Sequence, residues 1–194
     1  MSRRLHLNLF IQSRGHHEAS WRHAKASPLA LTDPAYIEDL ALKAEAGLLD
    51  SIFLADALAL WDDVAHAPHN WLEPITTLAT VARATRHIGL IATASTTYSE
   101  PFNLARQFAS LDHISSGRVG WNIVTSWSMA AAGNFGDTAQ VSHEERYARA
   151  EDFMEAVYGL WDSWSDDAVL DDRRGGLYAD PAKIRPVNHI GPHY

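Results

Sequence analysis

The sequence predicts an α/β fold in which parallel strands alternate with helices, as in a TIM-type (β/α)8 barrel. Three times a short apolar strand, a polar loop and a helix follow one another, and a fourth strand then begins. The loops after the strands are long and rich in His, Trp, Asp, Ser and Thr, whereas the returns from helix to strand are short. This asymmetry is typical of a barrel whose site lies on the loops after its strands. A doubly wound sheet shows it too, but no G-x-G-x-x-G motif follows any strand.

Short apolar runs and helix start signals define the elements in order. Strands are expected at residues 5–11, 48–55, 87–94 and 118–125. Proline at the first helical position, after an acidic residue that can cap the helix, predicts three helix starts. These pairs are Asp33-Pro34, Glu73-Pro74 and Glu100-Pro101, and Gly47 and Gly117 are expected to end the first and third helices.

The last third of the chain differs in pattern from the first two thirds. A stretch rich in Ser, Ala, Gly and Asn follows the fourth strand, and a helix is then expected at residues 143–161. Ser142 and Glu145 form an S-x-x-E capping box at its start. Residues from about 162 to 194 have no clear period and are expected to form an excursion loop.

Four strands are too few to close such a barrel. A (β/α)8 barrel takes roughly 250 residues, and the chain has 194. We therefore expect residues 1–194 to form the N-terminal half of one barrel domain, truncated after about four β/α units. An open half barrel exposes a strand edge and an apolar face, so association, either as a homo-oligomer or with a second polypeptide, is expected.

Composition excludes several classes of protein. The net charge of −8 comes without a basic stripe, which disfavours nucleic-acid binding. The chain has no Cys, so disulfides and thiolate chemistry are excluded. No stretch approaches the roughly 18 apolar residues that span a membrane. We expect a cytoplasmic protein that does not bind membranes.

Polar residues at the strand ends are the first candidates for a site. Asp56 ends the second strand, Thr93 and Ser95 lie at the end of the third, and Asn122 interrupts the apolar fourth strand. A carboxylate, small hydroxyls and a buried amide could contact a flat cofactor ring. The alternatives are a cap or turn role for Asp56, ordinary turn chemistry for the hydroxyls, and backbone partners for the amide.

His143 and Tyr147 are a second candidate pair, since residues four apart share a helix face. A helix N-terminus attracts anions, so a phosphate nearby is plausible. The alternative is that Tyr147 belongs to the apolar stripe that continues to Trp161 and packs in the core.

The first loop brings together histidines and a tryptophan. His17 and Trp21 are expected to form a lid or to contact the substrate. No H-x-H or H-E-x-x-H pattern is present, so no metal site is expected there. A G-x-S-x-G motif is also absent, which leaves a serine hydrolase without support.

Four stretches carry a resemblance to a known family. They are GHHEASWRH in the first loop, FLAD at the end of the second strand, the block HIGLIATASTTYSEPFNLARQFASLDHISSGRVGWNIVTS, and SHEERYARAEDF at the late helix start. They cover most of the chain in order. The sequence resembles the bacterial-luciferase-like flavin monooxygenases, in the branch of nitrilotriacetate monooxygenase component A, pristinamycin synthase and dibenzothiophene-sulfone monooxygenase.

The resemblance implies a two-component, FMNH2- and O2-dependent monooxygenase that acts on a small organic substrate. Reduced FMN would come from a separate NADH-dependent flavin reductase. By matching position, Asp56, Thr93, His143 and Tyr147 would contact FMN, with Ser95 and Asn122 as weaker candidates. His17 and Trp21 would lie near the substrate. No residue is assigned a catalytic role, because the flavin performs the oxygen chemistry.

Two other functions stay open. One is a deazaflavin-dependent oxidoreductase of the same superfamily, although the block ATASTTYSEPFNLAR favours the monooxygenase branch. The other is a non-catalytic half-barrel remnant, which flavin binding would distinguish from the enzymes.

Overall fold

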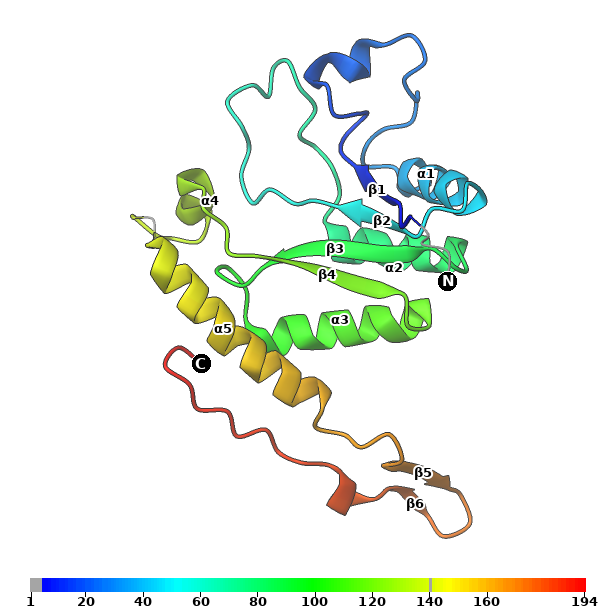
Figure 1. Ribbon diagram of the computed structural model, residues 1–194, viewed down its shortest axis with the longest axis vertical. Helices are drawn as coiled ribbons and strands as arrows, with labels where there is room; N and C mark the ends of the chain where they lie inside the picture. The colour runs from blue at the N-terminus through cyan, green and yellow to red at the C-terminus, as the bar shows by residue number, and fades with distance from the viewer. Residues whose placement is uncertain (1–4, 140) are drawn as a thin grey trace.

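Four parallel strands form the sheet at the centre of the molecule. The computed structural model describes residues 5–139 and 141–194. The strands lie in the order β1-β2-β3-β4, and all three pairs are parallel (Figure 1). Their bounds are β1 (Asn8–Ile11), β2 (Ser51–Leu54), β3 (Gly89–Ser95) and β4 (Val119–Val124). The predicted parallel sheet is confirmed, with strands displaced or shortened by a few residues at their ends.

Three helices follow the first three strands, as predicted. They are α1 (Pro34–Ala46), α2 (Pro74–Ala84) and α3 (Pro101–Ser115). The Asp33 carboxylate accepts from the backbone N–H of Ala35 at 3.0 Å and so caps α1. Glu73 likewise accepts from two N–H groups at the start of α2. Glu100 makes no side-chain cap bond, so at α3 proline alone supplies the start signal.

The end of α3 differs by one residue from the prediction. Ser116, not Gly117, is the first residue beyond the helix, and it is left-handed with φ 59°. Gly117 follows at φ 80°. Two successive left-handed residues turn the chain sharply into β4, and glycine relieves the strain at the second.

The two faces of the sheet are buried to different degrees. Ile52 and Leu90 are fully buried beneath the helices. On the opposite face, Phe10 and Phe53 are only half-buried, and their ring centroids lie 4.8 Å apart. Ile91 lies in register with Phe53 on this face and is also half-buried. Helices on one face and an open opposite face are what four units of a β/α barrel produce.

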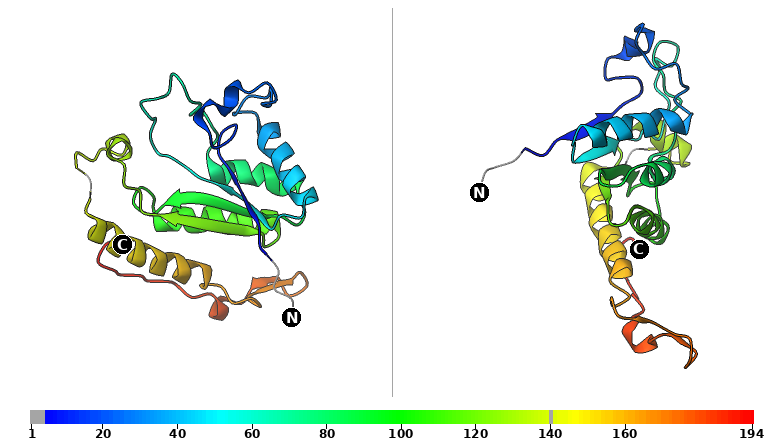
Figure 2. Two further views of the ribbon diagram at one scale, coloured as in Figure 1. Left: turned by 45° about the horizontal axis from the view of Figure 1, so that its top comes forward. Right: turned by 90° about the vertical axis from the view of Figure 1, so that its right-hand side faces the viewer.

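The described residues of the last third of the chain contain a short helix, a hairpin and a 3-10 helix, η2 (Pro181–Lys183), that the sequence did not predict. A short helix, α4 (Met129–Asn134), lies in the small-residue stretch, and an antiparallel hairpin of β5 (Val169–Asp172) and β6 (Leu177–Ala179) lies in the expected excursion loop. The hairpin lies away from the main sheet, beyond the end of α5 (His143–Trp161) (Figures 1 and 2). The final residues then run back alongside α5. That residues 162–194 form an excursion from the barrel stays a prediction.

The predicted start of α5 is confirmed. The Ser142 hydroxyl accepts from the backbone N–H of Glu145 at 3.1 Å, which is one half of the capping box. Across the described residues, no helix has the length and apolar character needed to cross a membrane.

Candidate active site

Two cavities meet at the carboxyl end of β2. The first, here called the aromatic pocket, has a volume of about 690 Å³ and lies between the loops that follow β1 and β2; Phe10, Trp21, Trp61 and Trp71 are among its lining residues. The second, here called the α5 pocket, has a volume of about 720 Å³ and is lined by the residues after β4 together with Tyr147 and Met154. Asp56 lines both cavities. The strand-end carboxylate therefore stands where the two cavities adjoin.

The electrostatics of Asp56 are those of a partly buried acid. Burial is the largest influence and raises the pKa of its carboxyl, and the nearby Glu73 carboxylate raises it further. The backbone N–H of Ala57, which donates to Oδ1 at 2.9 Å, and a hydrogen bond from the Trp71 side chain oppose the increase only in part. A buried carboxyl of this kind gains from a partner that donates a hydrogen bond.

The predicted residues of β3 and β4 contact each other directly. The Asn122 amide donates to the Thr93 hydroxyl at 3.0 Å, in line with the pairing of these residues in the sheet. The hydroxyls of Ser95 and Ser126 lie 2.8 Å apart. Ser95 is two residues beyond Thr93 on β3 and so lies nearer the carboxyl edge of the sheet. Thr93 and Ser95 are both buried, and neither they nor Asn122 line the two cavities. They form a polar layer under the carboxyl edge of the sheet.

His143 and Tyr147 stack on each other at the start of α5. Their ring centroids are 4.4 Å apart at an interplanar angle of 27°. Tyr147 is 51% exposed and lines the α5 pocket, so it does not pack in the core as the apolar stripe suggested. His143 is not among the residues that line either cavity.

The first loop and the loop after β2 are joined by a hydrogen bond. His17 caps the short helix η1 (Glu18–Arg22) by accepting from the backbone N–H of Ala19. Trp21, on η1, donates from its indole N–H to the carbonyl of His66 at 2.8 Å. Both His17 and Trp21 line the aromatic pocket. The structure therefore brings these two residues to the same cavity as Asp56.

Comparisons with known proteins place the chain in a family. A family model described as luciferase-like monooxygenase matches residues 8–194. The chain belongs to the luciferase-like monooxygenase family. The resemblance that the sequence motifs indicated is thereby confirmed.

Individual members of the family match the whole chain but only part of themselves. Nitrilotriacetate monooxygenase component A of Aminobacter aminovorans is 44% identical over 205 residues, which cover 100% of this chain and 45% of that protein. A crystal structure of a long-chain alkane monooxygenase superposes with a TM-score of 0.93 at 35% identity, covering 100% of this chain and 48% of that one. A crystal structure of a riboflavin lyase with modified FMN and riboflavin superposes with a TM-score of 0.89 at 36% identity. The match covers 99% of this chain and 45% of that one. The chain thus spans about half the length of these relatives.

Other residues at the carboxyl edge of this luciferase-like chain were not singled out from the sequence. Arg146 is buried, and its guanidinium donates to the carbonyl oxygens of Thr125 and Ser126, which ties α5 to the end of β4. His69 donates from Nε2 to Asp63 at 2.7 Å in the loop after β2. The loop's density of His and Trp was the only signal in the sequence for the second pair.

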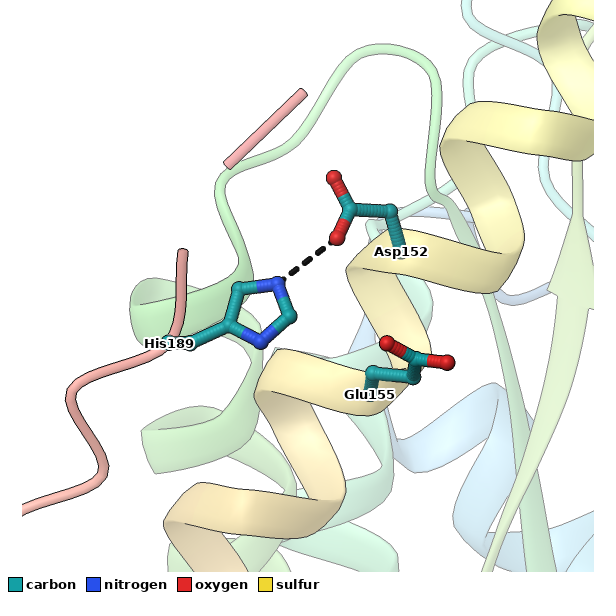
Figure 3. Close-up of side chains that lie close together, drawn as sticks. All are labelled: Asp152, Glu155 and His189. Carbon is teal, nitrogen blue, oxygen red and sulfur yellow. Dashed lines mark hydrogen bonds and ion pairs between the residues drawn. The ribbon is translucent and has the colours of Figure 1, made fainter. Parts of the chain in front are cut away.

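A further cluster of polar side chains lies where the final segment of the chain runs beside α5. Asp152 accepts from His189 Nε2 at 2.7 Å and from the backbone N–H groups of His193 and Tyr194 at 2.7 and 3.0 Å. Glu155 lies one turn further along α5 (Figure 3). The side chains of Asp152, Glu155 and His189 are close enough to one another to hold a cation. The Asp152 carboxylate is already occupied by three donors, so the cluster serves to anchor the final segment.

Proposed function

We propose that the chain is the flavin-binding half of an FMNH2- and O2-dependent monooxygenase that acts on a small organic substrate. The observation that carries the proposal is the position of Asp56, a partly buried carboxyl between two cavities at the carboxyl edge of a parallel sheet. Sites of β/α barrels lie at this edge. Family membership and the similarity to a chain solved with modified FMN support the choice of a flavin.

The residues of the α5 pocket fit a flat ring. Ala57, Ala131 and Ala150 line this pocket, and such small side chains allow a planar group to approach closely. Tyr147 offers an exposed aromatic ring from the same helix turn as His143. Asp56 offers an acceptor for an N–H or O–H donor.

In this proposal the chain's own residues bind and orient the cofactor. Asp56 and Tyr147 contact it directly, while Thr93, Ser95 and Asn122 hold the ends of β3 and β4 in place beneath the pocket through their hydrogen bonds. His143 supports Tyr147 by stacking. When bound, reduced FMN would supply the activation of O2, and the protein would supply orientation and a water-poor site.

Two partners complete the proposal. A separate NADH-dependent flavin reductase supplies the reduced FMN, in line with the name of one relative, nitrilotriacetate monooxygenase component A. The remaining half of the barrel, which this chain does not contain, supplies the rest of the site. We expect weak flavin binding by the 194-residue chain alone.

Titration with reduced FMN under anaerobic conditions tests the proposal. We expect saturable quenching of tryptophan fluorescence, and we expect Asp56→Asn to weaken binding by about tenfold to a hundredfold because a hydrogen bond to a charged group contributes about 1.5–3 kcal/mol. Asp166→Asn, at an exposed position after α5, serves as the control and should bind as the parent chain does. Absence of saturable binding by the parent chain, or equal binding by Asp56→Asn, would contradict the proposal.

A further inference from the structure

The aromatic pocket has walls suited to a bound group rather than to a packed core. Trp21 comes from η1, and Trp61 and Trp71 come from the loop after β2. Trp21 and Trp61 remain 44% and 48% exposed. Large aromatic side chains at the mouth of a cavity supply contact area and negatively charged ring faces to a ligand.

The charged residues that line this pocket are all acidic. Glu18, Asp56, Asp62 and Asp63 line it, and no Lys or Arg is among its described lining residues. The nearest arginine along the chain, Arg14, donates to the carbonyl of Leu29 at the base of the first loop, and its guanidinium lies 5.9 Å from the centroid of the Tyr36 ring in the pocket wall. Arg14 therefore contacts one aromatic side chain of the wall, while no Lys or Arg among the described lining residues pairs with the four carboxylates.

His69 fixes one of these carboxylates in place. Its Nε2 donates to Asp63 at 2.7 Å, while its Nδ1 is buried without a hydrogen-bond partner. A proton on Nδ1 would have no acceptor, so a ring that carries its proton on Nε2 fits the surroundings. In this arrangement His69 orients Asp63 and leaves the negative charge of the carboxylate available to the pocket.

We infer that the aromatic pocket selects an organic molecule that carries an amine or quaternary ammonium group. Carboxylates attract the cation, and the faces of Trp21, Trp61 and Trp71 add cation–π attraction. A carboxylate ligand would instead meet like charges. The inference rests on the proposed function in taking this pocket as the substrate side.

Calorimetric titration with three probes of similar shape tests the inference. Benzyltrimethylammonium carries the cation, benzyl alcohol is neutral and phenylacetate is an anion. We expect benzyltrimethylammonium to bind saturably and about tenfold more tightly than benzyl alcohol, with phenylacetate weakest, and we expect added salt to reduce this preference. No saturable binding of the cation, equal affinity for the cation and the alcohol, or a preference for phenylacetate would overturn the inference.

Two variants test whether the carboxylates hold the cation; Asp62 lines both cavities, whereas Asp63 lines the aromatic pocket and not the α5 pocket. Asp62→Asn and Asp63→Asn should each weaken binding of the cation by about twofold to fivefold, the effect expected of one partly exposed charge, without changing binding of benzyl alcohol. Asp62→Asn leaves the His69–Asp63 hydrogen bond intact and so keeps the test independent of local unfolding. Asp166→Asn is the control. Unchanged affinity for the cation in both pocket variants would overturn the inference.

The titrations are carried out without flavin, which separates this inference from the proposed function. Cation selectivity without binding of reduced FMN would contradict the flavin proposal alone. Binding of reduced FMN without cation selectivity would contradict the substrate inference alone.

Discussion

At the residue scale, Asp152 connects the final segment of the chain to α5. Its carboxylate accepts one side-chain and two backbone donors, all from residues 189–194. Tyr194, which this contact holds, packs edge-on against Phe153 at 5.4 Å, and its hydroxyl lies within reach of the Thr96 carbonyl at the end of β3. The anchor therefore fixes the chain end next to the carboxyl edge of the sheet.

The close approach at this anchor predicts the effect of a single methyl group. A Cβ at position 191 would overlap the Asp152 carboxylate, so in Gly191→Ala either the final segment or the Asp152 side chain must shift, and either shift disturbs the anchor. We expect a loss of about 1–3 kcal/mol in the free energy of unfolding, as for other overpacked sites, measured by urea denaturation. Gly133→Ala is the matched control, since a Cβ in α4 meets nothing within 4 Å. Equal effects of the two substitutions would contradict the role given to the anchor.

The same carboxylate gives stability a defined dependence on pH. Burial, the largest influence, raises the pKa of Asp152, but the N–H groups of His193 and Tyr194 and the His189 side chain outweigh it, so that the pKa lies below its ordinary value. A pKa lowered by folding means that the stabilisation is complete above the ordinary value and is lost as pH falls through the folded value.

We therefore predict that the difference in melting temperature between the parent chain and Asp152→Asn is largest near neutral pH and shrinks in acid. Thermal melts of both proteins, recorded from neutral pH into acid, measure this difference in melting temperature. Using the difference matters, because other carboxyls, such as Glu45 and Asp50, also have lowered pKa values. A difference that is constant with pH would show that the charge of Asp152 does not stabilise the fold.

At the element scale, Arg118 joins the C-terminal ends of α2 and α3 at the edge of the sheet where β3 and β4 begin. It lies just before β4 and donates to the carbonyl oxygens of Ala82, Ile88 and Ser115, and to the side chain and carbonyl of Thr85. These acceptors belong to the ends of α2 and α3 and to the start of β3. One guanidinium therefore satisfies carbonyl groups that helix ends leave without partners.

Replacing this guanidinium by an ammonium should destabilise the fold. Burial lowers the pKa of Arg118, which shows that its charge already carries a desolvation cost. Arg118→Lys keeps the charge but cannot reach five acceptors, so we expect a loss of about 2–4 kcal/mol in the free energy of unfolding, measured by urea denaturation. Arg83→Lys, exposed on α2, is the control and should change stability by less than about 0.5 kcal/mol. A small effect at position 118 would mean that water replaces these contacts.

The sequence predicts those elements whose signals are local. Asp33-Pro34 and Glu73-Pro74 mark helix starts through bonds that span only two or three residues, and the structure confirms both. The helix α4 was missed because its residues, MAAAGN, carry no apolar period. The hairpin of β5 and β6 was missed because its strands are only four and three residues long and almost fully exposed, without the alternation that a half-buried strand shows.

The residues of the candidate site also fall into those that a local signal predicts and those that it does not. Residues at strand ends, such as Asp56 and Thr93, could be predicted because parallel strands end at one edge of a sheet. Partners joined across long sequence separations could not, because neither member carries a local signal. The contacts of Arg146 with Ser126 and of Trp21 with His66 are of this kind.

At the scale of the whole molecule, the sheet has one covered and one open face. The open face carries Phe10, Phe53 and Ile91, each half-buried, and the outer edges of β1 and β4 pair with no other described strand. Open edges and apolar faces favour association. The chain should therefore bind apolar dyes and self-associate when no complementary half barrel is present.

A single substitution on the open face distinguishes association through this face from nonspecific association through any exposed apolar side chain. Phe53→Ser removes a large apolar group from that face, so we expect weaker fluorescence of bound anilinonaphthalene sulfonate and a smaller associated fraction in sedimentation velocity, because burial of one aromatic side chain contributes about 1.5–3 kcal/mol to an interface. Ile190→Ser removes an apolar side chain that is 94% exposed near the chain end and should change neither measurement. If both variants reduce association equally, the exposed apolar surface acts without regard to position, and the sheet face is not the surface that associates.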